Sequence, residues 1–415
     1  MTDSTNPIRS LLSNRFVQII IASNVLIQLG IWIRNFAVLL FVMEKTNGNP
    51  IAVSLISVAE FAPIFAFSIL AGTFSDRWEP KRTLIGSDFL SALSIFAVLI
   101  SMLFGSWKTI FIVTLMSSIL SQFSAPAGMK LFKTHVSEQL LQSGMSLYQS
   151  INAMFVVFGP ILGTFIYQQF GIYVAVGIIC FTFLLSAGIL TLLPVKREFV
   201  EEKALTTVWK DMKQGIQYVI SNKTLRTIGG CFMVTGLALG LIQPLLIFLV
   251  TDRLQLPKEY LKWLMTADGV AMIIGTVLAM GLSRKVSPQQ QLLVGMICIS
   301  VALLGFGIST QLWLTLLFQV ICGLVLPCIQ ISINTMTLQN TEETYIGRVN
   351  GLLTSMYMGS MMITMSVSGW FMHVFSLVII FSLSALFCII GATVVVPLLR
   401  KPSNHGINQP TSSTP

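Results

Sequence analysis

Hydrophobic positions along the chain gather into twelve long runs, and short polar stretches separate them. An α-helix crosses the hydrocarbon core of a bilayer in about 20 residues, so runs of this length predict membrane-spanning helices. The pattern therefore predicts an all-α membrane protein. The twelve runs cover residues 16–43, 51–74, 83–104, 107–128, 146–168, 171–193, 225–250, 260–282, 290–308, 311–333, 348–370 and 374–398.

Composition agrees with this pattern and excludes several kinds of site. The 415 residues are 54% hydrophobic and only 10% charged, whereas soluble domains are about 25% charged. The polar start leads into a full-length apolar run, so no cleaved signal peptide is expected. All six cysteines fall inside apolar runs, and the three histidines are scattered. No disulfide framework, metal site or cofactor is predicted.

Basic residues predict the orientation. Twelve spans place both termini on one side of the membrane, and nineteen of the 25 Lys and Arg residues fall on that side. The positive-inside rule therefore predicts that both termini and the central loop are cytoplasmic. The net charge of +9 then reflects topology and affinity for anionic lipid, and nucleic-acid binding is not expected.

The longest polar stretch divides the twelve runs into six and six. This division predicts a six-helix bundle over residues 1–195, a cytoplasmic linker over 196–224 and a second bundle over 225–400. Residues 401–415 are polar and rich in Ser, Thr and Pro, so they are expected to form a disordered cytoplasmic tail.

An internal repeat relates the two halves. An offset of 208 residues aligns the first two runs with the seventh and eighth, pairing Glu60 with Asp268 and Glu44 with Asp252. Rare charges that coincide in this way predict two pseudo-symmetric bundles in parallel orientation. Secondary transporters built from such repeats bind substrate near the bilayer midplane, between the halves.

Four ionisable residues fall within the apolar runs: Arg34, Glu60, Asp88 and Asp268. A charge at the centre of a spanning helix costs about 2.5–3.5 kcal/mol, so such residues usually face a cavity or a partner. Arg34, Glu60 and Asp268 share a similar depth, which for Arg34 is roughly 12 Å from the outer end of its run. A protonatable carboxylate at this depth could couple substrate movement to protons.

These residues leave alternatives open. Glu60 serves either as such an acid or as one half of a fixed ion pair with Arg34. Asp268 has no cationic neighbour in the sequence, and it is favoured as the coupling or substrate-binding acid. Asp88 lies five residues into its run from the cytoplasmic end, so we expect it to pair with charges of the neighbouring loop.

That loop carries a recognisable motif. The stretch "GTFSDRWEPKR" at 72–82 resembles the signature loop of the major facilitator superfamily, G-x-x-x-D-R-x-x-x-[KR]-R. The resemblance implies the twelve-helix fold of that superfamily and transport by alternating access. It also implies that this loop and Asp88 form a cytoplasmic gate. The gate residues implied within the loop are Gly72, Asp76, Arg77, Lys81 and Arg82.

A second motif lies in the fifth run. "FGPILGTF" contains Gly159, Pro160 and Gly163, and it resembles the core of a motif associated with exporters of the superfamily. The alternative is a proline kink with small residues that allow close helix packing.

The resemblance extends over nearly the whole chain. "SAPAGMKLFKTHVSEQLLQSGMSLYQS" at 124–150 and "GRVNGLLTS" at 347–355 resemble the macrolide-efflux branch of the drug:proton antiporters, which also includes siderophore exporters. The chain departs from that pattern at Ile31, where the family often has an acid, and it has no basic residue in "TIFIVTLMSSILSQFSAPAG" at 109–128, where many drug antiporters carry one. These departures shift the expected proton coupling onto Glu60 and Asp268.

The resemblance also implies which side chains line a central cavity, because the first, fourth, seventh and tenth helices of this superfamily are central. Arg34, Glu60 and Asp268 are expected to face it together with polar and aromatic side chains. These are Asn24, Gln28, Trp32, Asn35, Gln243, Gln330, Asn334 and Tyr357.

The function implied is efflux of amphiphilic or lipophilic molecules, such as macrolide-like drugs, coupled to protons across a bacterial inner membrane. Alternatives of the same fold are siderophore export and lysophospholipid transport. The expected partners are a small-molecule substrate, protons and lipid, and the chain is expected to be a monomer. No G-x-x-x-x-G-K-[ST] motif is present, so ATP is not expected to drive transport. The spans hold no set of nucleophile and base, so an enzyme is not expected.

Overall fold

The protein is described by a computed structural model, in which the described part of the chain is almost entirely helical. A bilayer offers no water to the backbone, so a chain that crosses it must satisfy its N–H and C=O groups within its own helices. The structure describes residues 14–77, 79–105, 108–135, 138–193, 206–282, 286–342 and 345–399.

The helices of the first half surround one core. They are α2 (Arg15–Lys45), α3 (Pro50–Arg77), α4 (Pro80–Leu103), α5 (Thr109–His135) and α6 (Glu138–Thr191). α6 consists of two helical segments that meet at Gly171, whose φ of 75° lies in a region that glycine tolerates. It therefore holds two of the predicted spans.

The second half follows a separate helix, α7 (Thr206–Ser221). Its elements are α8 (Lys223–Ile242), η1 (Gln243–Leu245), α9 (Leu246–Phe248), η2 (Leu249–Arg253), η3 (Lys258–Tyr260), α10 (Leu261–Leu282), α11 (Pro288–Ile308), α12 (Leu312–Gln339), α13 (Ile346–Val374) and α14 (Leu377–Leu399).

The helices confirm the predicted twelve-span fold. Nine helical stretches of the described residues are long and apolar enough to cross a membrane, and the one at Ser150–Thr191 is bent in two. α5 and α13 correspond to the two remaining predicted segments. The seventh segment is divided among α8, η1, α9 and η2 because Pro244 has no N–H with which to continue the α-helical ladder.

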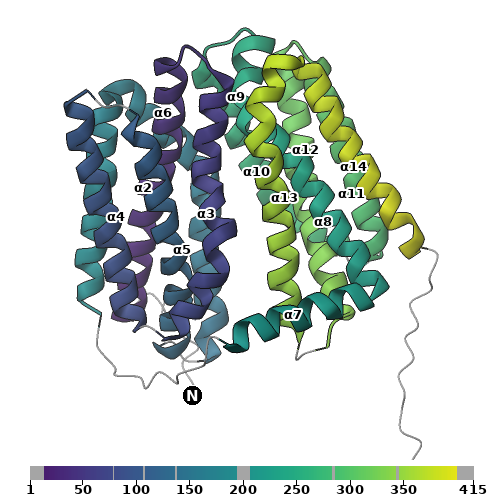
Figure 1. Cartoon of the computed structure of the whole chain (residues 1–415), viewed down its shortest axis with the longest axis horizontal. Coiled ribbons are helices and arrows are strands. Elements are labelled where there is room, and N and C mark those ends of the chain that lie inside the picture. The colour runs from purple at the N-terminus through teal and green to yellow at the C-terminus, as the bar shows by residue number, and fades with distance from the viewer. Residues whose placement is uncertain are drawn as a thin grey trace, which may run out of the picture.

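Figure 1 shows two bundles side by side, α2–α6 on one side and α8–α14 on the other. α7 lies across one end of the molecule, which we call the α7 end. Gln214 accepts a hydrogen bond of 3.0 Å from Arg348, and the rings of Tyr218 and Tyr345 stack with centroids 4.4 Å apart. The linker helix is therefore attached to the second bundle.

The two bundles touch toward the end opposite α7. Ser54 of α3 and Ser368 of α13 have hydroxyl oxygens 3.0 Å apart, and Thr266 of α10 donates to the carbonyl of Val157 in α6 at 3.1 Å. Gly369 leaves no room for a Cβ, which would lie 2.5 Å from the carbonyl oxygen of Pro50. Within the described residues, the hydrogen bonds between the bundles all lie toward this end.

Candidate functional site

A cavity of about 310 Å³ lies between the bundles, between α2 and α3 on one side and η1, α9 and α10 on the other. Its polar and aromatic wall includes four of the residues predicted from sequence: Trp32, Asn35, Glu60 and Gln243. Asn35 and Gln243 occupy equivalent positions of the internal repeat, so each bundle contributes an amide at the same place.

A chain of hydrogen bonds joins the charges at this wall. The Asn35 amide nitrogen donates to Glu60 Oε1, and the Asn35 carbonyl oxygen accepts from Arg34 Nε at 3.2 Å and from Arg34 Nη2 at 3.1 Å. Arg34 Nη1 donates to Ser117 of α5 at 2.7 Å. Arg34 is 4% exposed, so its charge sits inside the first bundle and reaches the cavity through Asn35.

This geometry answers the question of a fixed Arg34–Glu60 pair. The ion pairs found among the described residues do not include one between these two side chains, because Asn35 lies between them. Asn35 bonds only Oε1 of Glu60, so Oε2 can accept a hydrogen bond from another group. Glu60 also lines the cavity, where that group could be a bound molecule. Arg34 of α2 also brings a positive charge next to α5, through its hydrogen bond to Ser117.

Two glycines of α6, Gly159 and Gly163, pack against the side of α2 that carries the cavity residues Trp32 and Phe36. A Cβ on Gly163 would lie 2.8 Å from the Cβ of Phe36 and 2.8 Å from the carbonyl oxygen of Trp32. A Cβ on Gly159 would overlap the Trp32 ring. Gly159 and Gly163 therefore let α6 pack directly on α2, where the Trp32 ring lines the cavity. Pro160, which follows Gly159 in the sequence, lies inside α6.

The family model of the Major Facilitator Superfamily matches residues 20–228 and 228–414, one match for each half of the chain. The chain belongs to the Major Facilitator Superfamily. Membership makes it a transporter and not an enzyme, and a multi-pass membrane protein that acts on small molecules.

Relatives of this superfamily include efflux pumps. The chain is 26% identical over 325 residues to the multidrug efflux pump Tap of Mycolicibacterium fortuitum, which covers 75% of this chain and 78% of Tap. It is 21% identical over 353 residues to the uncharacterized MFS-type transporter YkuC of Bacillus subtilis, covering 82% and 81% of the two chains.

Solved transporters share the fold at low sequence identity. A crystal structure of the nucleoside transporter NupG, in mutant form, matches with a TM-score of 0.76 at 12% identity, over 93% of this chain and all of that one. A POT family transporter in complex with a thioalcohol-conjugated peptide matches with a TM-score of 0.73 at 10% identity, over 93% and 96% of the two chains.

In this member of the superfamily, Asp268 lies away from the cavity wall. It packs against α12, where a Cβ on Gly323 would meet the backbone oxygen of Asp268 at 2.6 Å. Its Oδ1 is buried and has no hydrogen-bond partner, and the same holds for Oε1 of Gln319 in α12. The acid favoured from sequence is therefore not among the residues that line the cavity between the bundles.

The remaining predicted cavity residues are spread over other surroundings. Asn24 and Gln28 donate to Oδ1 of Asn152 in α6, at 3.3 and 2.6 Å, and line a different cavity within the first bundle. Gln330 and Asn334 are exposed on α12. Tyr357 of α13 meets the ring of Phe232 edge-on, with centroids 5.9 Å apart.

The predicted gate is only partly described. The surroundings of Gly72 and the side chains of Asp76 and Arg77 lie outside what the structure describes. Lys81 Nζ donates to the carbonyl oxygens of Thr191 and Leu193, at 2.9 and 2.6 Å, and so closes the end of α6. Arg82 pairs with Glu79, three residues earlier, at 2.7 Å.

Asp88 was expected to pair with charges of the neighbouring loop, but it does not pair with Lys81 or Arg82, the basic residues of that loop whose side chains are described. Asp88 is 1% exposed, and its Oδ2 accepts a hydrogen bond of 2.6 Å from Ser186 of α6. The helix face that carries Asp88 turns into the first bundle and not toward the loop, because Ser87, Asp88 and Ser91 are all buried there.

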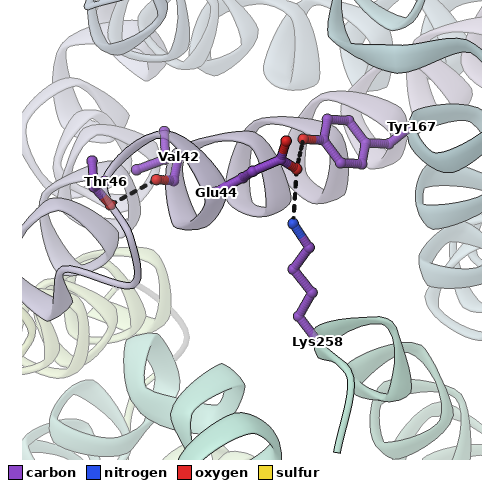
Figure 2. Close-up of polar contacts among 5 residues, drawn as sticks. All are labelled: Val42, Glu44, Thr46, Tyr167 and Lys258. Carbon is purple, nitrogen blue, oxygen red and sulfur yellow. Dashed lines mark hydrogen bonds and ion pairs between the residues drawn. The ribbon is translucent and has the colours of Figure 1, made fainter.

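The sequence did not predict a polar contact that joins the two bundles at the end opposite α7. Figure 2 shows Glu44 between Tyr167 of its own bundle and Lys258 of the other. Glu44 Oε2 lies 2.9 Å from Lys258 Nζ and accepts a hydrogen bond of 2.9 Å from the Tyr167 hydroxyl. The repeat had marked Glu44 as a rare charge, but its partners are far away in sequence.

A larger hollow of about 520 Å³ lies between α10 and α12, and it is not a convincing site. Its wall is almost wholly apolar and includes Trp263 and Trp313, which are 50% and 82% exposed. In a membrane protein, such a surface is covered by lipid chains. We therefore take the smaller cavity between the bundles, with its carboxylate and amides, as the candidate site.

Proposed function

We propose that this transporter exports amphiphilic or lipophilic small molecules, macrolide-like drugs among them, in exchange for protons across a bacterial cytoplasmic membrane. The single observation that carries the proposal is Glu60, a carboxylate at the wall of the cavity between the bundles, bridged by Asn35 to Arg34. The relationship to the efflux pump Tap supports a drug-like substrate.

The cavity suits such a substrate. Its volume of about 310 Å³ lies at the lower end of the range of about 300–1,000 Å³ that pockets for drug-sized ligands have. Trp32, Phe36 and Phe61 supply flat apolar surface, while Asn35 and Gln243 supply hydrogen bonds from opposite bundles. A ligand held by both bundles moves from one side to the other when the bundles rock.

Glu60 supplies the exchange step. In its ionised form it attracts a cationic or hydrogen-bond-donating substrate, and Asn35 and Arg34 stabilise that form. A proton that binds Glu60 from the outside removes this attraction and releases the substrate. The proton then leaves toward the cytoplasm once the cavity faces inward, because Arg34 again favours the charged carboxylate.

The basic residues support an orientation in which the α7 end is cytoplasmic. The bundles touch at the opposite end, through Ser54 and Ser368 and through Glu44 and Lys258, and this supports assignment of the structure to the state that faces the cytoplasm.

The test uses everted membrane vesicles with a pH-sensitive dye, with erythromycin and a lipophilic cationic dye as substrates. We expect substrate-dependent proton release from wild type, a loss of at least about tenfold in Glu60→Gln, and near-normal release in Asp268→Asn. Proton movement that survives Glu60→Gln but disappears in Asp268→Asn would assign coupling to the second bundle. Proton movement absent from wild type with every substrate would refute antiport.

A further inference from the structure

A second polar cavity, of about 220 Å³, lies inside the first bundle among α2, α4, α5 and α6. It shares no lining residue with the cavity between the bundles. Its wall holds one carboxylate, that of Asp88, among oxygen-bearing side chains. These are Ser23, Asn24, Gln28, Ser91, Ser121, Ser124 and Tyr148.

Asp88 is held by hydroxyl groups. Its Oδ2 accepts from Ser186 Oγ at 2.6 Å, and Ser186 Oγ lies 2.8 Å from Ser23 Oγ. All three side chains are at most 3% exposed. In the part of the chain that the structure describes, Oδ1 of Asp88 makes no hydrogen bond, and Asp88 has no cationic partner.

The basic residues described on the surrounding helices do not pair with Asp88: Arg82 pairs with Glu79, Lys45 lies over the Phe41 ring, and Arg15 is exposed at the start of α2. Lys81 of α4 donates to the carbonyl oxygens of Thr191 and Leu193, and Arg34 of α2 donates to Ser117 and Asn35. Tyr148 is the other titratable side chain that lines the cavity. Among the described residues, Asp88 is therefore a buried carboxyl group that no basic side chain pairs with.

A charged carboxylate at this place is unfavourable unless a proton neutralises it or a cation balances it. An unpaired carboxylate inside a protein costs several kcal/mol, and a charge at membrane depth faces a further penalty. A single carboxylate balances a single positive charge, so a divalent ion is not expected. Carboxylate and neutral oxygen donors are the ligands that hard metal cations prefer.

We propose that Asp88 and Ser23 of the cavity wall, with Ser186 holding Oδ2 of Asp88 in place, form a binding site for one monovalent metal cation, for which Na⁺ is the probe. The ion lies against Oδ1 of Asp88 and takes further oxygen donors from the hydroxyl groups of the wall. Because Asp88 comes from α4, Ser186 from α6 and Ser23 from α2, the bound ion fastens three helices of the first bundle together. This site is independent of the proposed export by Glu60.

The test measures binding of radioactive sodium to the purified full-length protein in lipid nanodiscs, at alkaline pH. We expect one saturable site per chain in wild type, no site in Asp88→Asn, and affinity reduced about tenfold or more in Ser186→Ala. Glu60→Gln is the matched control, an intramembrane acid changed in the same bundle, and it should bind sodium like wild type. Added protons should displace sodium.

Thermal unfolding provides a second readout that also checks folding. Replacing choline by sodium should raise the Tm of wild type by about 2–4 °C and leave that of Asp88→Asn unchanged. If Asp88→Asn does not elute as a single species, Ser186→Ala and Ser23→Ala take its place. Wild type that binds no sodium, or that responds to pH alone, overturns the metal site. Equal binding by wild type and Asp88→Asn, or by wild type and both serine variants, overturns it as well.

Discussion

Glu60 and Asp268 occupy equivalent positions of the internal repeat, yet they have different surroundings. Glu60 lines the cavity and receives a hydrogen bond from Asn35. Asp268 packs against α12 with Oδ1 buried and without a hydrogen bond. The repeat thus places two acids at the same depth, while the side chains around them decide which acid can meet a substrate.

The difference arises one helix away from each acid. In the first bundle, Asn35 of α2 stands between Glu60 and Arg34. Its counterpart in the second bundle, Gln243, lies at the Pro244 interruption, where the helix passes through a 3-10 turn. Gln243 lines the cavity, and within the described part of the chain it makes no hydrogen bond to Asp268. The two bundles therefore differ at this place, because the helix of the second bundle is interrupted at Pro244 and α2 is not.

The largest effect is expected when the bridge in the first bundle is removed. Asn35→Leu deprives Glu60 and Arg34 of hydrogen bonds to a charged group, each of which contributes about 1.5–3 kcal/mol. Transport in everted vesicles should fall at least about tenfold. Gln243→Leu, the equivalent change in the other bundle, should reduce transport less. Equal losses in both variants would mean that the two amides act alike and that the bridge to Arg34 is unimportant.

A smaller effect is expected from the glycines that pack against each region. Gly163→Ala forces a Cβ against Phe36 and Trp32, and Gly323→Ala forces one against Asp268 and Ala271. Each should lower the Tm, at a cost of about 1–3 kcal/mol. We expect the transport rate per folded molecule to fall in Gly163→Ala, because Gly163 packs against residues that line the cavity. In Gly323→Ala the transport rate per folded molecule should stay the same.

Gly177 gives the control for these glycines. It also lies in α6, but a Cβ there would meet nothing within 4 Å. Gly177→Ala should leave transport and Tm unchanged or raise the Tm slightly, since alanine favours helix more than glycine does. If Gly163→Ala behaves like Gly177→Ala, the close packing of α6 on α2 does not matter for function.

The smallest effect is expected at the contact between the bundles. The Glu44 side chain is 62% exposed, and exposed ion pairs contribute little. Glu44→Gln should change transport less than about fivefold and should make its rate less dependent on salt. Lys258→Gln should resemble it, and the double variant should add nothing further. Loss of all transport in either single variant would show that this contact is indispensable.

Much of the fold follows from the sequence, because each spanning helix must be apolar over a fixed length. The repeat also located Asn35, Glu60 and Gln243, which the structure gathers at one cavity. Asn24 and Gln28 were expected at the same cavity, but they donate to Asn152 of α6 and line the cavity inside the first bundle. Helical spacing reveals which side chains share a face but not which neighbour covers each stretch of it.

Contacts between distant segments account for the other errors. The environment of Asp88 depends on Ser186, 98 residues later, and no local pattern connects the two. The contact of Glu44 with Lys258 joins residues 214 apart and exists only while the bundles touch at this end. Sequence position indicated the depth of each charge, whereas its partner followed from how the helices pack.

The packing of Gly159 and Gly163 on Trp32 has a consequence for engineering. The shape of the cavity depends on residues that a bound molecule never touches, because the backbone of α6 sets how far the Trp32 ring reaches inward. The range of substrates could then be altered by enlarging a side chain of α6 and making the side chain at position 32 smaller. Gly159→Ala combined with Trp32→Leu is one such exchange, and it leaves every acid and amide of the cavity in place.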